Sequence, residues 1–223
     1  MDGCPAYVVA MTTVQRRAFN NTVTRFWSVV AKAYDWGPLQ RWVYQPAQDE
    51  MLAQVRERNS RRVVDIACGT GILASRLRAE LASTQVSGVD MSEGMLAQAQ
   101  ARSPLVNWQV APAEHLPFDD GVLDAVLSTS AFHFFDQPAA VAEFHRVLTP
   151  GGFAAVATIS PRRHRLARLH RLVSNRVPAN MPTPAEMRTL FENAGFHVAV
   201  QRPVRRPITP PLVSVDWITV GVK

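Results

Sequence analysis

Short β-branched runs alternate with helical segments along the middle of this chain, and this alternation limits its fold more than any other feature. The run RRVVDIAC is followed by the turn Gly69-Thr70-Gly71 and by ILASRLRAELA, whose leucines share one helical face. The runs QVSGVD, VNWQVA, DAVLSTS and FAAVATI continue the series, with helical segments at 92–101 and 138–148 among them and a turn predicted over 149–152. This spacing predicts a parallel, doubly wound α/β sheet.

The C-terminal end breaks the alternation. Thr183 is a typical N-cap for a helix over 184–194, which Gly195 ends. FHVAVQR and DWITVGVK have the composition of strands, but only a short proline-rich segment joins them. A parallel pair needs a longer crossover, so these last two strands are predicted to be antiparallel.

Composition excludes several classes of protein. Hydrophobic residues make up 47% of the 223 residues and charged residues 19%, which excludes a wholly disordered chain. No apolar run approaches the roughly 20 residues of a membrane-spanning helix, and the N-terminus does not resemble a secretory signal. The two cysteines, Cys4 and Cys68, form no disulfide framework, so we expect the reducing cytoplasm.

Basic charge is concentrated in one segment. Residues 160–206 hold ten arginines against two acids, a net charge of +8, whereas the rest of the chain has 14 basic and 16 acidic residues. A basic coat over the whole surface would favour non-specific nucleic-acid binding. The charge here is local instead, and no nucleic-acid partner is expected.

The glycine turn after the first predicted strand has the chemistry of a nucleotide site. Its glycines let the backbone approach a ligand, and the next helix offers unpaired N–H groups. Asp90, at the end of the second strand, suits a carboxylate that accepts both ribose hydroxyls of an adenosine. Gly69-x-Gly71-x-x-Ala74 also matches the dinucleotide fingerprint, so a nicotinamide or flavin cofactor stays open. Asp65 would repel a pyrophosphate and favours a cationic ligand such as S-adenosylmethionine.

From about residue 60 to its end, the chain resembles the class I S-adenosylmethionine-dependent methyltransferases. It is most similar to the methyltransferase type 11 group, which includes the ubiquinone/menaquinone-biosynthesis enzymes. The matching motifs are VVDIACGTG, SGVDMSEGMLAQAQ, AEHLPFDDGVLDAVLSTSAFHFF, EFHRVLTPGG, TPAEMRTLFENAGFHV and DWITVGVK. The resemblance implies a Rossmann-like, doubly wound, seven-stranded sheet with an antiparallel last strand and an N-terminal helical lid.

The resemblance also implies roles for single residues. Asp65 would contact the methionine ammonium through water, Asp90 would hold the ribose, and Met91 would pack on the adenine. Two departures are Ala67, where the family usually has glycine, and Pro112, where an acid often reads the adenine amino group. The remaining expected cofactor contacts are Ala67, Cys68, Gly69, Gly71, Met95, Ala113, Glu114 and Ser128.

We expect one methyltransferase domain with covering segments around a cofactor-binding core. The predicted divisions are a flexible N-terminal tail at 1–12 and a single domain at 13–223, which comprises a helical lid at 13–59, the core at 60–160, a basic lid segment at 161–182 and the C-terminal helix and strands at 183–223.

The methyl acceptor should bind outside the carboxyl ends of the strands, near the aromatic stretch at 130–135. His133 in this stretch is a candidate base, although it can equally shape the loop. Tyr34 matches a family Tyr-Asp pair and is a candidate lid contact. No metal site is predicted. The arginines between Arg162 and Arg176 have three interpretations: a solvated helix over the site, a contact for an anionic acceptor, or a peripheral contact with an anionic membrane.

The expected activity is therefore methyl transfer from S-adenosylmethionine to a small, partly apolar acceptor. The sequence favours O- or C-methylation of a phenol, quinone or acid, because aromatic residues surround the predicted pocket. Two alternatives remain open at this point. One is a non-catalytic protein that binds S-adenosylmethionine, and the other is a dinucleotide-dependent oxidoreductase.

Overall fold

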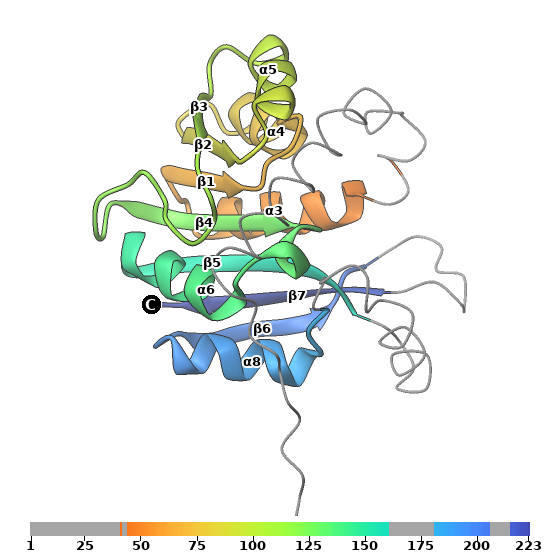
Figure 1. Cartoon of the computed structure of the whole chain (residues 1–223), viewed down its shortest axis with the longest axis vertical. Helices are drawn as coiled ribbons and strands as arrows, with labels where there is room; N and C mark the ends of the chain where they lie inside the picture. Colours follow the sequence, from red (N-terminus) through yellow and green to blue (C-terminus); the bar gives the residue numbers. More distant parts are fainter. Residues whose placement is uncertain (1–40, 42–43, 161–180, 206–214) are drawn as a thin grey trace, which may run out of the picture.

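The computed structural model describes residues 41, 44–160, 181–205 and 215–223 of the chain. Within these ranges one sheet has the strand order β3-β2-β1-β4-β5-β7-β6 (Figure 1). Its strands are β1 (Arg62–Ile66), β2 (Gln85–Asp90), β3 (Asn107–Val110), β4 (Leu123–Thr129), β5 (Leu148–Ser160), β6 (His197–Pro203) and β7 (Val215–Val222).

Strand directions follow the prediction. β1 to β5 pair in parallel, and β7 runs antiparallel to both of its neighbours, β5 and β6. The long β5–β7 ladder runs from Phe153 opposite Val222 to Ser160 opposite Val215. The short link before β7 leaves no length for a crossover helix, so the reversed last strand is the geometric result. The predicted seven-stranded sheet with an antiparallel last strand is confirmed.

Helices cover both faces of the sheet (Figure 1). Phe144 and Phe191 pack with Val64 on one face, and Leu77 packs with Val63 on the other. Neighbouring strand residues point to opposite faces, which is why Val63 and Val64 join different cores. No helix in the described ranges has the length and hydropathy of a membrane span. The helices are α3 (Gln45–Glu57), α4 (Ile72–Glu80), α5 (Glu93–Arg102), α6 (Gln137–Val147), α8 (Pro184–Asn193) and the 3-10 helix η2 (Phe132–Phe134).

Helix α3 falls inside the predicted lid at 13–59 but packs directly on the sheet. Its apolar residues Met51, Leu52 and Val55 are buried in the core that β4, β5 and β7 share. This part of the predicted lid is therefore a fixed layer of the domain. The predicted tail at 1–12 and the lid residues before residue 41 lie outside the described residues.

The predicted turn at 149–152 is wrong, because these residues belong to β5. Leu148 already pairs with Leu123, and the next pair is Phe153 with Ala125. β5 thus uses three more residues than β4 over this step, and a bulge absorbs them. Gly151 has φ +80° within the bulge, a conformation that glycine adopts without steric cost. The Pro-Gly-Gly signal marks this irregularity and not a break between elements.

Candidate functional site

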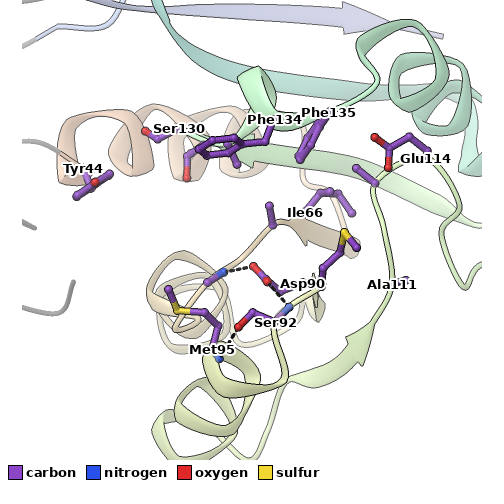
Figure 2. A pocket seen from close by; sticks show the side chains of 16 residues that line it. Tyr44, Ile66, Asp90, Ser92, Met95, Ala111, Glu114, Ser130, Phe134 and Phe135 are labelled. Carbon is purple, nitrogen blue, oxygen red and sulfur yellow. Dashed lines mark hydrogen bonds between the residues drawn. The ribbon is translucent and has the colours of Figure 1, made fainter. Parts of the chain in front are cut away.

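A pocket lies at the edge of the sheet where β1, β2 and β4 end (Figure 2). Its space, including the open mouth, is about 890 Å³. The strand order reverses between β1 and β4, and open α/β sheets bind ligands at such a point. The pocket is lined by Tyr44, Ile66, Ala67, Gly69, Asp90, Met91, Ser92, Met95, Ala111, Ala113, Glu114, Thr129, Ser130, Ala131, Phe134 and Phe135.

Asp90 lies at the base of the pocket, at the end of β2 (Figure 2). Its Oδ2 accepts a hydrogen bond from the Gly69 backbone N–H at 2.8 Å, and its Oδ1 accepts one from the Ser92 N–H at 2.8 Å. Burial raises the pKa of this carboxyl, while these backbone bonds lower it. The carboxylate is therefore fixed in orientation before any ligand binds, as a ribose contact requires.

The glycine turn contributes two residues to the pocket wall, Ala67 and Gly69. Gly69 has φ +55°, and no atom lies within 4 Å of the place where its Cβ would be, so the backbone there faces open space. Ala67 has φ +53°, a left-handed conformation that costs about 1–2 kcal/mol for a residue with a Cβ. The family's usual glycine would avoid this cost, which gives a physical meaning to the departure noted in the sequence.

Gly71 is required for packing and does not line the pocket. It has φ +75°, and a Cβ there would collide with the Trp108 ring and lie 2.8 Å from the Ala99 Cβ. A Cβ at Gly88 on β2 would collide with the same ring. The Trp108 side chain thus fills the space that two glycines leave, and any cofactor contact of Gly71 stays a prediction.

Asp65 is buried beneath the glycine turn, with 2% of its surface exposed. Its Oδ1 has no hydrogen-bond partner among the described residues. Burial and, to a smaller extent, the charge of Asp90 raise its pKa to about 8, although a hydrogen bond with the Ala74 backbone lowers it. A cation close by would lower this raised pKa and stabilise the ionised carboxylate, whereas a pyrophosphate would raise the pKa further. These residues fit S-adenosylmethionine, although Asp65 does not line the pocket.

The predicted adenine side of the pocket is assembled from β2, α5 and the segment after β3. Met91, Met95, Ala113 and Glu114 all line the cavity, and Met91 is 37% exposed within it. The Glu114 Oε1 accepts a hydrogen bond from the Asp136 backbone N–H at 2.6 Å, so this carboxylate is tied to the start of α6. The structure brings these four predicted residues together beside Asp90.

Two other predicted contacts lie behind the pocket wall. Cys68 is not part of the lining, and burial raises the pKa of its thiol well above its ordinary value, followed by the charges of Asp65 and Asp90. An inert thiol fits the expectation that Cys68 is not a nucleophile. Ser128 is fully buried, and its Oγ has no partner among the described residues. Direct cofactor contacts of Cys68 and Ser128 remain predictions.

The loop after β4 supplies the aromatic wall of the pocket. Ser130, Phe134 and Phe135 line it (Figure 2). Ser130 has a left-handed backbone conformation, with φ +57°. His133 is outside the lining, and its ring packs against Phe134 with the two ring centroids 4.0 Å apart. Burial lowers the pKa of His133 to about 4, so the imidazole is neutral at physiological pH. The structure therefore favours loop packing for His133, and its role as a base remains a prediction.

Several lining residues had no individual assignment from the sequence. Ile66 and Thr129 close β1 and β4, and Ser92 and Ala111 come just after β2 and β3. Position at a predicted strand end is the signal that would have identified them. Tyr44 had no such signal, because its place depends on how α3 packs on the sheet.

Tyr34 and the Arg162–Arg176 stretch lie outside the described residues. Among the described residues, no group of three or more His, Cys, Asp or Glu side chains could hold a metal ion.

Known sequences resemble this chain over its central part. Residues 64–156 match the methyltransferase domain family. A demethylmenaquinone methyltransferase of Thermus thermophilus is 39% identical over 110 residues, which are 47% of this chain and 50% of that protein. A malonyl-(acyl-carrier protein) O-methyltransferase of Hahella chejuensis is 31% identical over 153 residues, which are 67% and 54%. The chain thus spans about half the length of these curated relatives.

Solved structures share the fold over most of the chain. A SAM-dependent methyltransferase of Thermotoga maritima is 23% identical, with a TM-score of 0.68 that covers 89% of this chain and 99% of that chain. The cyclase SpnF is 18% identical, with a TM-score of 0.70 that covers 92% and 96%. At these identities the likeness concerns the fold alone, and proteins on one fold can differ in activity.

Proposed function

We propose that this chain, which belongs to the S-adenosylmethionine-dependent methyltransferases through its methyltransferase domain at residues 64–156, methylates a small, partly apolar acceptor. The family and the Rossmann-like fold predicted from the sequence are confirmed, and the cofactor of the family is S-adenosylmethionine. The proposed reaction is O- or C-methylation of a phenol, quinone or acid. The names of two relatives, one for methylation of demethylmenaquinone and one for O-methylation of a malonyl group on an acyl-carrier protein, support the quinone and acid classes.

One observation carries the proposal: an adenosine-type site and an aromatic wall share one pocket. Asp90 is oriented by two backbone N–H groups beside the open backbone of Gly69, and Phe134 and Phe135 line the same cavity. In Figure 2, Ser130 and Phe134 lie across the cavity from Asp90. A cofactor held at Asp90 would therefore present its reactive end to an apolar acceptor compartment.

The chain's residues have distinct tasks in this reaction. S-adenosylmethionine supplies an activated methyl group on a sulfonium when it is bound. Asp90 binds and orients the ribose, and the Met91 side chain covers the adenine. Phe134 and Tyr44 exclude water and align the acceptor, whose attacking atom must reach the methyl carbon at about 3–3.5 Å. A base is needed only if the acceptor must lose a proton.

The buried acids favour this cofactor over a dinucleotide. A pyrophosphate at the glycine turn would lie close to the Asp90 carboxylate, whose negative charge would repel it, and it would raise the already high pKa of Asp65 further. The sulfonium and ammonium groups of S-adenosylmethionine would instead be attracted to these acids. The oxidoreductase alternative is therefore the weaker one on electrostatic grounds.

A non-catalytic cofactor-binding protein is the second candidate. Within the described part of the lining, the ionisable side chains other than Tyr44 are Asp90 and Glu114, and both accept backbone N–H groups. Methyl transfer itself, and not binding, separates the two candidates.

The proposed acceptor is a free small molecule in the cytoplasm. The scarcity of cysteine supports this reducing compartment. A peripheral membrane contact through Arg162–Arg176 is retained as part of the proposal for a lipophilic acceptor. Nucleic acid is not among the proposed partners, because the net positive charge is confined to residues 160–206.

Two measurements test the proposed function. Isothermal titration of the full chain with S-adenosylhomocysteine should show binding, and NADH should give no heat of binding. Incubation with methyl-labelled S-adenosylmethionine and a panel of phenols, quinols and aromatic or fatty acids should then transfer label to at least one acceptor. Tight NADH binding without S-adenosylhomocysteine binding would overturn the cofactor assignment. Cofactor binding without transfer to any acceptor would favour the non-catalytic alternative.

A further inference from the structure

The glycine turn is held from the side opposite the pocket by residues of the α5–β3 region. The Arg102 Nε, at the end of α5, donates a hydrogen bond to the Thr70 backbone carbonyl at 2.9 Å. Thr70 is fully buried in the middle of the turn, whereas Arg102 is largely exposed. An exposed, charged side chain thus reaches inward to the backbone of the segment that forms the cofactor wall.

Trp108 supports the same turn by packing. Its ring occupies the space in which a Cβ of Gly71 or Gly88 would lie. The indole Nε1 donates a hydrogen bond to the Ser103 carbonyl at 2.9 Å, which fixes the ring orientation relative to the end of α5. The turn therefore packs on the Trp108 ring of β3, which the Ser103 carbonyl holds in place.

Backbone hydrogen bonds within the turn connect the Arg102 contact to the residues that face the pocket. The Gly71 N–H donates to the Cys68 carbonyl at 3.0 Å, and the Gly69 N–H donates to Asp90 at 2.8 Å. The Thr70 carbonyl and the Gly71 N–H belong to one peptide group, so rotation of that group would break the Gly71–Cys68 bond. That bond encloses Gly69, whose N–H orients Asp90. Arg102 can thus influence Asp90 although it does not line the pocket.

We infer that Arg102 is a positioning residue that holds the glycine turn, and through it Asp90, in the conformation that binds the cofactor. This inference rests on the proposed function, because it assigns Asp90 and Gly69 to S-adenosylmethionine. A hydrogen bond from a charged donor is worth enough that its loss should change affinity roughly three- to tenfold.

Arg102→Ala in the full chain tests the inference, with Arg78→Ala as its matched control. The Arg78 Nη1 also donates to a backbone carbonyl near a helix end, that of Ala82 at 3.1 Å, but away from the turn. Titration with S-adenosylhomocysteine should give a dissociation constant about three- to tenfold higher in Arg102→Ala and within about twofold of wild type in Arg78→Ala. Arg102→Lys, which keeps a donor of the same charge, should recover part of the affinity.

Two further readouts separate positioning from general destabilisation. The Gly69 and Gly71 amides should exchange with deuterium faster in Arg102→Ala than in Arg78→Ala. Turnover at saturating cofactor should stay close to wild type while the KM for S-adenosylmethionine rises. Wild-type affinity in Arg102→Ala, or equal losses in the two variants, would overturn the inference and leave the proposed function standing. Failure of the wild-type chain to bind S-adenosylhomocysteine would overturn both.

Discussion

Asp90 combines two tasks at the residue scale. It accepts the Gly69 and Ser92 backbone N–H groups, and it faces the pocket. A carboxylate has about four lone-pair directions, so these bonds leave capacity for two ribose hydroxyls. The same side chain therefore orders the turn and is available to a ligand.

Asp90→Ala should weaken S-adenosylhomocysteine binding about tenfold or more, because hydrogen bonds to a charged group are worth about 1.5–3 kcal/mol. Asp124→Ala is the matched control. Its Oδ2 also accepts two backbone N–H groups, from Arg61 at 3.0 Å and Arg62 at 2.9 Å, at the start of β1 and outside the pocket lining. Isothermal titration measures both variants. An unchanged dissociation constant in folded Asp90→Ala would refute the ribose assignment.

Asp65 should make the folded state less stable as pH rises, the opposite of the usual effect of a carboxyl group. Burial raises its pKa to about 8 in the folded chain, above its ordinary value of 3.8. Between these values the folded state keeps a proton that the unfolded state releases, so stability should fall as pH rises from about 4 to about 8.

Asp65→Asn should remove this dependence. We expect its free energy of unfolding at pH 8 to exceed that of wild type by roughly 2–5 kcal/mol, with little difference below pH 4. Urea unfolding at several pH values measures the difference, and S-adenosylhomocysteine affinity should fall in the same variant. Equal pH dependence in the two proteins would show that Asp65 is ionised in the fold.

His133 is neutral over the working pH range, since burial lowers its pKa to about 4. Because it packs on Phe134 outside the lining, we expect His133→Asn to keep kcat/KM within about tenfold, with an unchanged profile between pH 6 and 8. His145→Asn is a suitable control, because burial also lowers the pKa of His145 and its ring packs on Phe196. A specific loss of about 10²–10⁴-fold in His133→Asn would instead identify it as the base for a hydroxyl acceptor.

At the scale of secondary-structure elements, one ion pair joins helix α3 to strand β6. Arg202 donates to both oxygens of Glu50 at 2.6 and 2.7 Å. Hydrogen bonding from Arg202 lowers the pKa of Glu50 below its ordinary value, against the effect of burial. The pair therefore stabilises the fold above the ordinary pKa of 4.5, and this contribution is lost as pH falls through the lowered value. Since Tyr44 directly precedes α3, the same pair helps to fix one wall of the pocket.

Glu50→Gln should lower the free energy of unfolding by about 1–3 kcal/mol at pH 7, because it leaves Arg202 partly buried with a weaker partner. Glu192→Gln is the control, since its pair with Arg188 is exposed and 3.5 Å long. That change should cost less than about 0.5 kcal/mol. Urea unfolding at pH 7 measures the stabilisation by the Glu50–Arg202 pair, and urea unfolding at pH 3 tests whether acid removes it. Equal effects of the two substitutions would contradict the inferred role of the pair.

At the scale of the whole molecule, the charge distribution predicts how an anionic acceptor would bind. Residues 160–206 carry +8, and the rest of the chain carries −2. Replacing Arg162, Arg163 and Arg165 with Ala should raise the KM of an anionic acceptor and leave cofactor affinity unchanged. The effect should shrink as salt rises, because exposed charges are screened within about 10 Å at 0.1 M. Steady-state kinetics with a neutral acceptor is the control. Salt-independent KM values, equal in variant and wild type, would assign these arginines to a solvated surface.

The sequence by itself determined the sheet, most helices and the centre of the site. Hydrophobic periodicity and glycine turns are local signals, and they were sufficient to predict β1 to β7 and the antiparallel last strand. Asp90 and Gly69 could be assigned to the pocket because parallel strands bring their carboxyl ends to one edge, whereas the family resemblance assigned Met91. The turn predicted at 149–152 failed because a bulge and a turn share the same glycine and proline signal.

Only the tertiary structure decided which neighbouring residues face the pocket and which support it. Gly69 and Gly71 look alike in sequence, yet one backbone faces open space and the other packs on Trp108. Tyr44 reaches the site because α3 packs on the sheet, and Arg102 reaches the turn from a distant helix. Such contacts join residues far apart in the chain, and their geometry depends on how whole elements pack. Local propensity carries no information about that packing.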